Sequence, residues 1–325
     1  MKIRLGILLI ALLVAATGCS LPQINLFPQE GPLKEVVLEG TGQDKVLVLS
    51  IDGTISDKAK EGVLKPQPGM VQEFISHLKL AEKDPKIKAV LLKVNSPGGT
   101  VTASDILYHE ISAYKERTGV KLVVSMMDVA ASGGYYLSLP ADWIMAHPTS
   151  VTGSVGVIFM RPGVSGFMEK FGFAMNVSKS GAQKDMGSPF KASDPADEAI
   201  FQQLTDQMAH RFYDLVQKHR KLTPEQMQKV ATARIFLGED AVKMGLVDEV
   251  GYLKDALAKA KSLAGLGVNA KVVTYQRNES QEVHIYSASV ETGGAGPGLA
   301  VPSLSKMVGL PKTGFYYIWP AAVSE

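Results

Sequence analysis

The stretch MMDVAASGGYYLSLPAD, residues 126–142, is the most informative part of this sequence. It follows the β-branched run VKLVV at residues 120–124, so the sequence predicts a buried strand, a tight turn of small residues and an amphipathic helix. Ser132 lies at the turn, with two glycines directly after it. A serine in this place is either the N-cap of the helix or a nucleophile. The stretch by itself leaves both interpretations open.

Strands and helices alternate around this stretch. Apolar runs at residues 46–53, 87–95 and 143–146 predict buried strands, and apolar residues at helical spacing predict helices at 70–84 and 104–117. Crossovers of about 25–35 residues between strands favour an α/β domain with a mostly parallel sheet and right-handed connections. The folded domain is expected to span residues 36–276.

The second half of the chain is more helical. Asp194 and Pro195 are a start signal for a long helix, and Thr223 with Gln226 forms a capping-box pattern for another. After Gln276 the sequence is rich in Gly, Pro and Ser, which predicts a flexible tail over residues 277–325. The aromatic residues near its end are expected to dock on the domain, on a neighbouring copy or on lipid headgroups.

The N-terminus has the pattern of an export signal. Lys2 and Arg4 precede a twelve-residue apolar run that is shorter than the ~20 residues of a membrane-spanning helix. Residues 1–18 with Cys19 resemble a bacterial lipoprotein signal, which implies acylation of Cys19, a tether over residues 19–35 and a lipid-anchored protein of the cell envelope. Conventional signal cleavage and an uncleaved anchor are the alternatives, and all three export the chain.

Composition narrows the function classes. Cys19 is the only cysteine, so the domain has no intramolecular disulfide. Without the basic residues of the signal, the chain has equal numbers of basic and acidic residues. That balance gives no electrostatic footprint for nucleic acid. No cluster has metal-ligand spacing, so we expect neither a metal nor another cofactor.

Two further segments carry polar chemistry. NSPGGTV, residues 95–101, follows a buried strand, and its glycines let backbone N–H groups approach a reacting oxygen. SKSGAQKDMGSPF, residues 178–190, contains Lys179 and Lys184. A lysine serves as base for a serine when burial favours its neutral form. The alternative interpretations are an ordinary turn and a solvated loop.

Taken in order, four motifs resemble the short form of the signal peptide peptidase SppA family: NSPGG, AASGGYY, TGSVGV and SGAQKD. The resemblance covers about residues 45–260. It implies a ClpP/crotonase-like fold and a membrane-associated serine endopeptidase with a Ser–Lys dyad. It also implies a homo-oligomeric ring and apolar peptide substrates, such as remnant signal peptides.

The resemblance also implies roles for single residues. Ser132 matches the family's nucleophile, and Lys184, rather than Lys179, matches its general base. Ser154 matches a serine that orients the lysine. The backbone N–H groups of Gly99 and Gly133 match the oxyanion hole.

Other functions stay open on the sequence. A ClpP-type triad needs a histidine roughly 25 residues after the serine, and none stands there; His147 comes earlier, near the end of a predicted strand. A crotonase-type acyl-CoA enzyme shares the expected fold, but the export signal and a serine in the turn disfavour it. A non-catalytic scaffold that binds membrane-protein fragments is the third alternative.

Overall fold

The computed structural model describes residues 31–59, 68–277, 285 and 313–322. The predicted signal peptide, Cys19 and most of the predicted tether therefore lie outside the described residues. Contacts divide the chain after Pro32, and the fold described below belongs to the unit that begins at Leu33. Among the helices of the described ranges, none combines the length and apolar character that crossing a bilayer requires.

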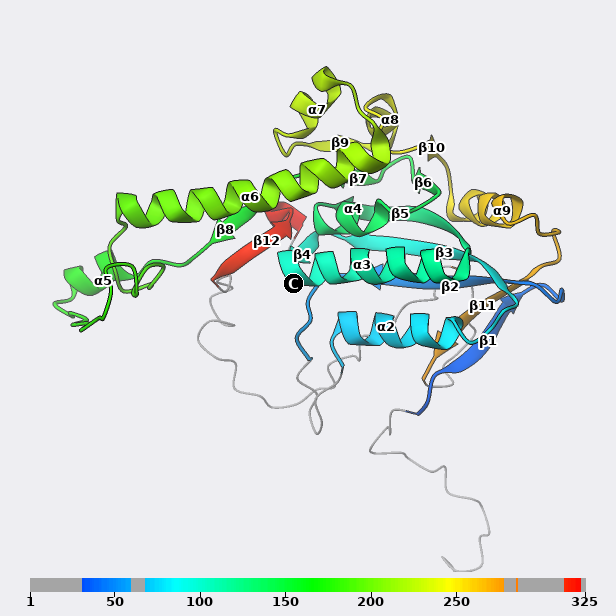
Figure 1. The fold of residues 1–325 in the computed structure, drawn as a ribbon, viewed down its shortest axis with the longest axis horizontal. Helices are drawn as coiled ribbons and strands as arrows, with labels where there is room; N and C mark the ends of the chain where they lie inside the picture. Colours follow the sequence, from blue (N-terminus) through cyan, green and yellow to red (C-terminus); the bar gives the residue numbers. More distant parts are fainter. Residues whose placement is uncertain (1–30, 60–67, 278–284, 286–312, 323–325) are drawn as a thin grey trace, which may run out of the picture. The chain divides into compact units, whose positions relative to one another are not determined.

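A central sheet organises the domain, with strands in the order β1-β11-β2-β3-β5-β6-β10 (Figure 1). All neighbours from β11 to β10 pair in parallel, whereas β1 pairs antiparallel with β11. The predicted α/β domain with a mostly parallel sheet is confirmed. Its strands are β1 (Lys34–Glu39), β2 (Lys45–Asp52), β3 (Ile87–Ser96), β5 (Lys121–Ala131), β6 (Trp143–Ala146), β10 (Glu249–Val250) and β11 (Lys271–Gln276).

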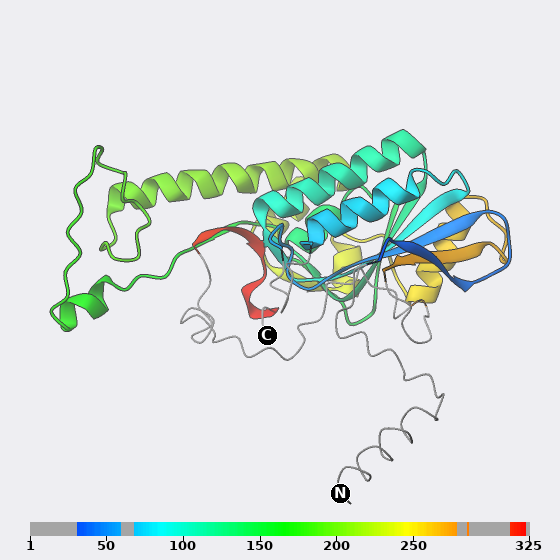
Figure 2. The ribbon, with the colours of Figure 1, turned by 90° about the horizontal axis from the view of Figure 1, so that it is seen from below.

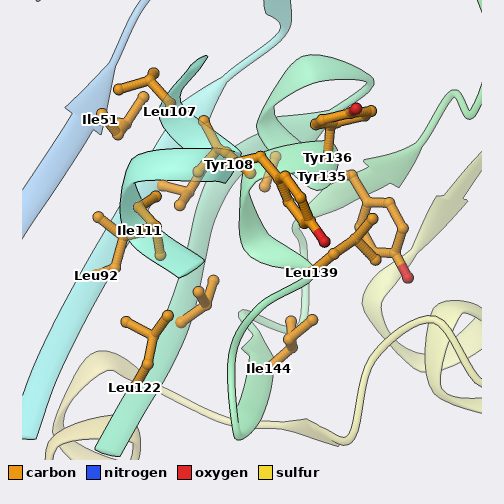
Figure 3. Close-up of a cluster of buried hydrophobic side chains, with 14 of the residues drawn as sticks. Ile51, Leu92, Leu107, Tyr108, Ile111, Leu122, Tyr135, Tyr136, Leu139 and Ile144 are labelled. Carbon is orange, nitrogen blue, oxygen red and sulfur yellow. The ribbon is translucent and has the colours of Figure 1, made fainter. Parts of the chain in front are cut away.

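Helices cover both faces of the sheet (Figure 1, Figure 2). Side chains alternate along each strand, so Leu92 joins the core on one face and Leu91 the core on the other. Figure 3 shows part of the larger core, where Ile51 and Leu92 of the strands lie next to Leu107 and Ile111 of α3. The larger core packs α2 (Met70–Ala81), α3 (Val101–Thr118) and α4 (Gly133–Ser138), and the smaller core packs α9 (Leu253–Leu263).

In the second half of the chain, two helices begin where their capping residues predict. The Asp194 side chain accepts a hydrogen bond from the Ala196 N–H at 2.9 Å, and Thr223 and Gln226 form the expected capping box. These caps start α6 (Pro195–Arg220) and α7 (Pro224–Val230), which are followed by β9 (Ile235–Leu237) and α8 (Gly238–Lys243). β9 pairs antiparallel with β7 (Val151–Gly153), and β7 pairs in parallel with the last residues of β5.

A second, three-stranded sheet has the order β4-β12-β8. Its strands are β4 (Gly98–Thr100), β8 (Ile158–Met160) and β12 (Gly314–Ile318); the helix α5 (Ser165–Lys170) follows β8. β12 lies within the segment that the sequence predicts as a flexible tail, so this part of the expectation is corrected. The reason is that β12 pairs with strands on both of its sides and buries Tyr317 completely.

A buried ion-pair cluster ties α2 to the chain just after β11. Glu73 accepts hydrogen bonds from Arg277 at 2.7 and 2.8 Å, and the His77 Nε2 lies 3.4 Å from the same carboxylate. Burial raises the pKa of Glu73, but the hydrogen bonds from His77 and Arg277 outweigh it and lower that pKa from 4.5 to about 2. The ionised carboxylate therefore stabilises the fold above pH 4.5, and this contribution is lost as the pH falls from 4.5 toward 2.

We expect the Glu73→Gln variant to lose about 2–3 kcal/mol of unfolding free energy at pH 7, because it leaves Arg277 beside a neutral group. The difference from the unsubstituted protein should shrink as the pH falls below 4.5. Urea unfolding from pH 7 to pH 3 measures both effects. Glu82→Gln is the control, because Glu82 pairs with Arg117 on the exposed surface. Equal losses in the two variants would contradict the account.

Candidate active site

Ser132 lies at the junction of β5 and α4 in an unusual backbone conformation. Its φ and ψ are 53° and −114°, a region that non-glycine residues occupy at a cost and that clusters at active sites. Its N–H donates to the Gly153 carbonyl at 2.8 Å, and its carbonyl accepts from the Tyr136 N–H at 2.8 Å. The side chain caps no helix N–H, so the N-cap interpretation of Ser132 does not describe its hydroxyl.

The hydroxyl of Ser132 is buried and has no hydrogen-bond partner among the described residues. Leaving a buried hydroxyl unpaired costs about 1–3 kcal/mol, so native folds rarely keep one without a reason. A strained backbone and an unpaired buried hydroxyl at the same residue are what a nucleophile held ready for a base would show.

The glycine loop after β3 faces this serine. Ser96 holds the loop, because its hydroxyl donates to the Gly53 carbonyl at 2.7 Å and accepts from the Gly98 N–H at 3.1 Å. The Gly98 carbonyl accepts from the Ile55 N–H at 2.9 Å, and the Thr100 N–H donates to the Ile55 carbonyl at 3.0 Å. Because backbone groups alternate in direction along a strand, Gly99 directs its N–H away from Ile55, toward β12.

A peptide carbonyl lies between this loop and the turn that contains Ser132. In the register of β12, Tyr317 pairs with Gly99, and the Trp319 N–H donates to the Pro97 carbonyl at 2.8 Å. A Cβ placed on Gly98 would overlap the Tyr317 carbonyl oxygen, and one placed on Gly133 would be 3.1 Å from the same oxygen. The two residues predicted for the oxyanion hole, Gly99 and Gly133, thus flank one carbonyl group.

Ser154 lies near Ser132, because the residue before it, Gly153, is hydrogen-bonded to the Ser132 backbone. Gly153, whose carbonyl accepts from the Ser132 N–H, directly precedes it, and the Ser154 N–H donates to the Arg234 carbonyl at 2.9 Å. Ser154 is buried and also has a positive φ, 51°. The structure therefore places the predicted orienting serine beside the predicted nucleophile.

Lys184, in contrast, does not lie at this site. It belongs to the segment that follows α5, and in both views α5 lies beyond the first turn of α6, away from α4 (Figure 1, Figure 2). Lys184 is exposed, so the described part of the chain does not form the desolvated pocket expected for it. Lys179 is held in the loop by hydrogen bonds to the Ala182 carbonyl at 2.9 Å and to Asp185 at 2.8 Å.

The segment that carries Lys184 is rich in exposed apolar side chains. We call residues 165–190 the arm. Six of its large apolar side chains are at least 45% exposed: Phe167, Phe171, Phe173, Met175, Val177 and Phe190. Several large apolar side chains exposed on one short segment are unusual on a monomer and suggest a contact surface for another molecule.

The base of the arm is fixed to α6. Lys191 contacts Asp197 at 2.5 Å, Arg161 forms an ion pair with Glu198, and the Phe159 and Phe201 rings stack with centroids 4.3 Å apart. These contacts hold the arm at the start of the helix.

Comparison with known proteins identifies the family of this chain. The sequence model of peptidase family S49 matches residues 114–267, and that of the Clp protease family matches residues 65–154. A candidate signal peptide peptidase SppA of Enterococcus faecium is 34% identical over 84% of this chain and 82% of its own. The chain belongs to peptidase family S49. It is a serine peptidase with a ClpP/crotonase-like fold.

Two longer relatives are also similar. Protease 4 of Salmonella typhi is 40% identical over 59% of this chain and 31% of its own length. The chloroplastic serine protease SPPA of Arabidopsis thaliana is 31% identical over 78% of this chain and 37% of its own length. This S49 peptidase thus spans about a third of each of these two relatives.

His147, the alternative base, has contacts that are typical of a structural residue. His147 lies 2.9 Å from the Thr149 hydroxyl, and its ring packs edge-on against Tyr252. Within the described ranges, no group of three His, Cys, Asp or Glu residues could hold a metal ion. Sequence reasoning did not identify Tyr317 or the structural serine Ser96; the position of Ser96 inside the NSPGG motif is the signal that points to it.

Gly98 offers a direct test of the oxyanion hole in the S49 peptidase. Its φ is 96°, and a methyl group there would overlap the Tyr317 carbonyl oxygen. We expect Gly98→Ala to lower kcat/KM for peptides about 10²–10³-fold.

Gly119→Ala is the matched control for Gly98→Ala. Gly119 has a φ of 68°, and nothing lies within 4 Å of a Cβ placed there. The substitution Gly119→Ala should cost about 1 kcal/mol of backbone strain and leave turnover intact. Steady-state kinetics of both variants distinguish the effects, and wild-type turnover in Gly98→Ala would contradict the assignment of the hole.

Proposed function

We propose that this peptidase cleaves apolar peptides, such as remnant signal peptides, with Ser132 as nucleophile and Lys184 of a second copy as general base. The observation that carries the proposal is the Tyr317 carbonyl, which lies against Gly98 and Gly133 directly beside Ser132. A substrate strand that pairs with β4 and β8 in the same way would present its carbonyl carbon to Ser132.

The reaction then follows from these groups. Neutral Lys184 takes the proton of Ser132, whose oxygen attacks the carbonyl carbon. The N–H groups of Gly99 and Gly133 stabilise the negative charge that develops on the carbonyl oxygen. Protonated Lys184 gives its proton to the leaving amine, and water hydrolyses the acyl-enzyme. Ser154 is a positioning residue that orients the lysine.

In this proposal a second copy supplies the base, because within one chain Ser132 lacks a described base and Lys184 lacks a desolvated pocket. The Ser132 hydroxyl has no described partner, and Lys184 is exposed on an arm covered with apolar side chains. Docking of the arm on a neighbouring copy would bury the six apolar side chains and desolvate Lys184. A homo-oligomeric ring follows if every copy docks its arm on the next copy and receives the arm of the previous copy.

We further propose that acylated Cys19 anchors the mature chain to a membrane of the cell envelope, outside the cytoplasm. The apolar run before Cys19 and the small residues around it support this location. An anchored enzyme would meet apolar peptides where they leave the bilayer. The mass of the mature N-terminal peptide tests the anchor, because a free Ser20 or an uncleaved Met1 would contradict it.

The proposed reaction is tested by a serine-directed fluorophosphonate and an apolar fluorogenic peptide. We expect the reagent to label Ser132 and to abolish peptide hydrolysis in parallel. Acyl-CoA turnover without labelling would support the crotonase-type alternative. Binding of membrane-protein fragments without labelling or turnover would support the scaffold.

A further inference from the structure

A bulge interrupts the pairing of β5 with β3 shortly before Ser132. Val94 of β3 pairs with Met126 of β5, but the next pair in the register is Ser96 with Ala130. Between these two pairs β5 has three residues and β3 has only one, so β5 contains two extra residues. Bulges bend a strand, and they are frequent next to active sites.

The bulge determines which part of the glycine loop lies level with Ser132. Because Ser96 pairs with Ala130, the same register continued by two residues places Gly98 level with Ser132. A Cβ placed on Gly98 would lie 2.6 Å from the Gly133 nitrogen, which agrees with this alignment. Without the two extra residues, Ser132 would lie about 6–7 Å further along β5 and past the start of the loop. The bulge therefore aligns the predicted nucleophile with the predicted oxyanion hole.

Side chains on both sides of β5 hold the bulge. The Asn95 Oδ1 of β3 accepts a hydrogen bond from the Val129 N–H at 3.2 Å. On the other side, the Ser150 hydroxyl shares its hydrogen bond between the Met126 carbonyl, at 2.9 Å, and the Met127 carbonyl. Ser150 directly precedes β7 and is completely buried. Because backbone groups that a bulge removes from the ladder need other partners, these side chains stabilise its shape.

Thr152 of β7 holds β5 directly after the bulge. Its hydroxyl donates to the Ala130 carbonyl at 2.7 Å, and its side chain is completely buried. The strand then leads into Ser132, whose N–H donates to the Gly153 carbonyl at 2.8 Å. The positive φ of Ser132, 53°, is a strained conformation that persists only where surrounding contacts fix it.

We propose that Asn95, Ser150 and Thr152 are positioning residues for catalysis. They fix the bulge of β5 and thereby hold Ser132 level with the N–H groups of the oxyanion hole. The proposal rests on the proposed function and adds the residues that align its nucleophile. Misplacement of a reacting atom by about 1 Å lowers rates about 10²-fold. Loss of one of these contacts should therefore lower kcat and leave KM nearly unchanged.

The hydrogen bond from Thr152 is tested with Thr152→Val and the matched control Thr274→Val. Thr274 of β11 is also buried, and its hydroxyl also donates to a carbonyl of a neighbouring strand, that of Val48 at 3.0 Å. Valine keeps the shape of the side chain in both variants, so urea should unfold them at similar concentrations. With an apolar fluorogenic peptide, we expect kcat to fall at least about tenfold in Thr152→Val and less than about twofold in Thr274→Val. Ser150→Ala should resemble Thr152→Val.

The hydrogen bond to Asn95 is tested by removing and by keeping its acceptor oxygen. Asn95→Leu leaves the Val129 N–H without this partner, whereas Asn95→Asp keeps an oxygen in the same place. We expect the rate constant for labelling of Ser132 by a fluorophosphonate to fall about 10–10²-fold in Asn95→Leu and less than about threefold in Asn95→Asp. A rate constant for labelling describes the folded molecules, so it does not depend on the fraction of protein that folds.

The possible results separate this inference from the proposed function. Equal kcat in the two valine variants, or equal labelling rates in the two Asn95 variants, would show that these side chains only stabilise the fold. A higher KM at constant kcat would assign them to substrate binding instead. Each of these results overturns the inference while hydrolysis by Ser132 stands. Absence of hydrolysis and of Ser132 labelling in the unsubstituted protein would refute the proposed function.

Discussion

Substitution of Ser132 by alanine should lower peptide hydrolysis about 10⁴-fold or more without lowering the stability of the fold. The loss of activity follows from removal of the nucleophile. We expect the fold to stay stable because the Ser132 hydroxyl is buried and has no described partner, so its removal breaks no described hydrogen bond. Removing an unpaired buried polar group should change the unfolding free energy by about 0 to 1 kcal/mol in the stabilising direction. Peptide kinetics and urea unfolding of the same preparation measure both.

Ser138→Ala is the control for Ser132→Ala. Ser138 is also buried and lies in the same short helix, but its hydroxyl donates to the Gly134 carbonyl at 2.7 Å. Its replacement should cost about 1 kcal/mol and leave turnover near wild type. The opposite pattern, with hydrolysis retained in Ser132→Ala, would show that another residue is the nucleophile.

Substitution of Lys184 by alanine should lower kcat about 10²–10⁴-fold, the usual effect of removing a general base. Lys179→Ala is the matched control, because it removes an equal charge from the same arm. Lys179 pairs with Asp185 inside the loop, so its loss should affect the arm locally and reduce turnover less. Titration of kcat against pH separates a base from a structural lysine. If Lys179→Ala loses turnover while Lys184→Ala keeps it, the assignment of the base is wrong.

Local sequence patterns predicted the parts of the fold that local physics controls. The buried strands β2, β3 and β5 have continuous apolar runs. The helices α2 and α6 have apolar faces at helical spacing, and Asp194 caps the start of α6. The short strands could not be predicted in this way. β4 has only the residues Gly-Gly-Thr, and it becomes a strand because β12 pairs with it.

The site was partly predictable for the same reason. Ser132, Gly99 and Gly133 belong to turns whose geometry depends on small neighbouring residues, and those turns lie together where strands β3 and β5 end. The position of Lys184 could not be predicted, because it lies on an arm whose exposed apolar side chains pack against no other part of the described chain. Tyr317 could not be assigned, because its segment has no partner until the β4–β8 cleft exists.

In the proposed mechanism, one active site combines Ser132 of one copy with Lys184 of another. Coexpression of Ser132→Ala and Lys184→Ala chains with different affinity tags allows mixed oligomers to be isolated. Each variant alone should be inactive. Random mixing should restore about one quarter of wild-type turnover, because a Lys184→Ala copy keeps Ser132 and receives the lysine from a Ser132→Ala neighbour. Mixed oligomers without hydrolysis would show that both groups must belong to one chain, and would contradict the account.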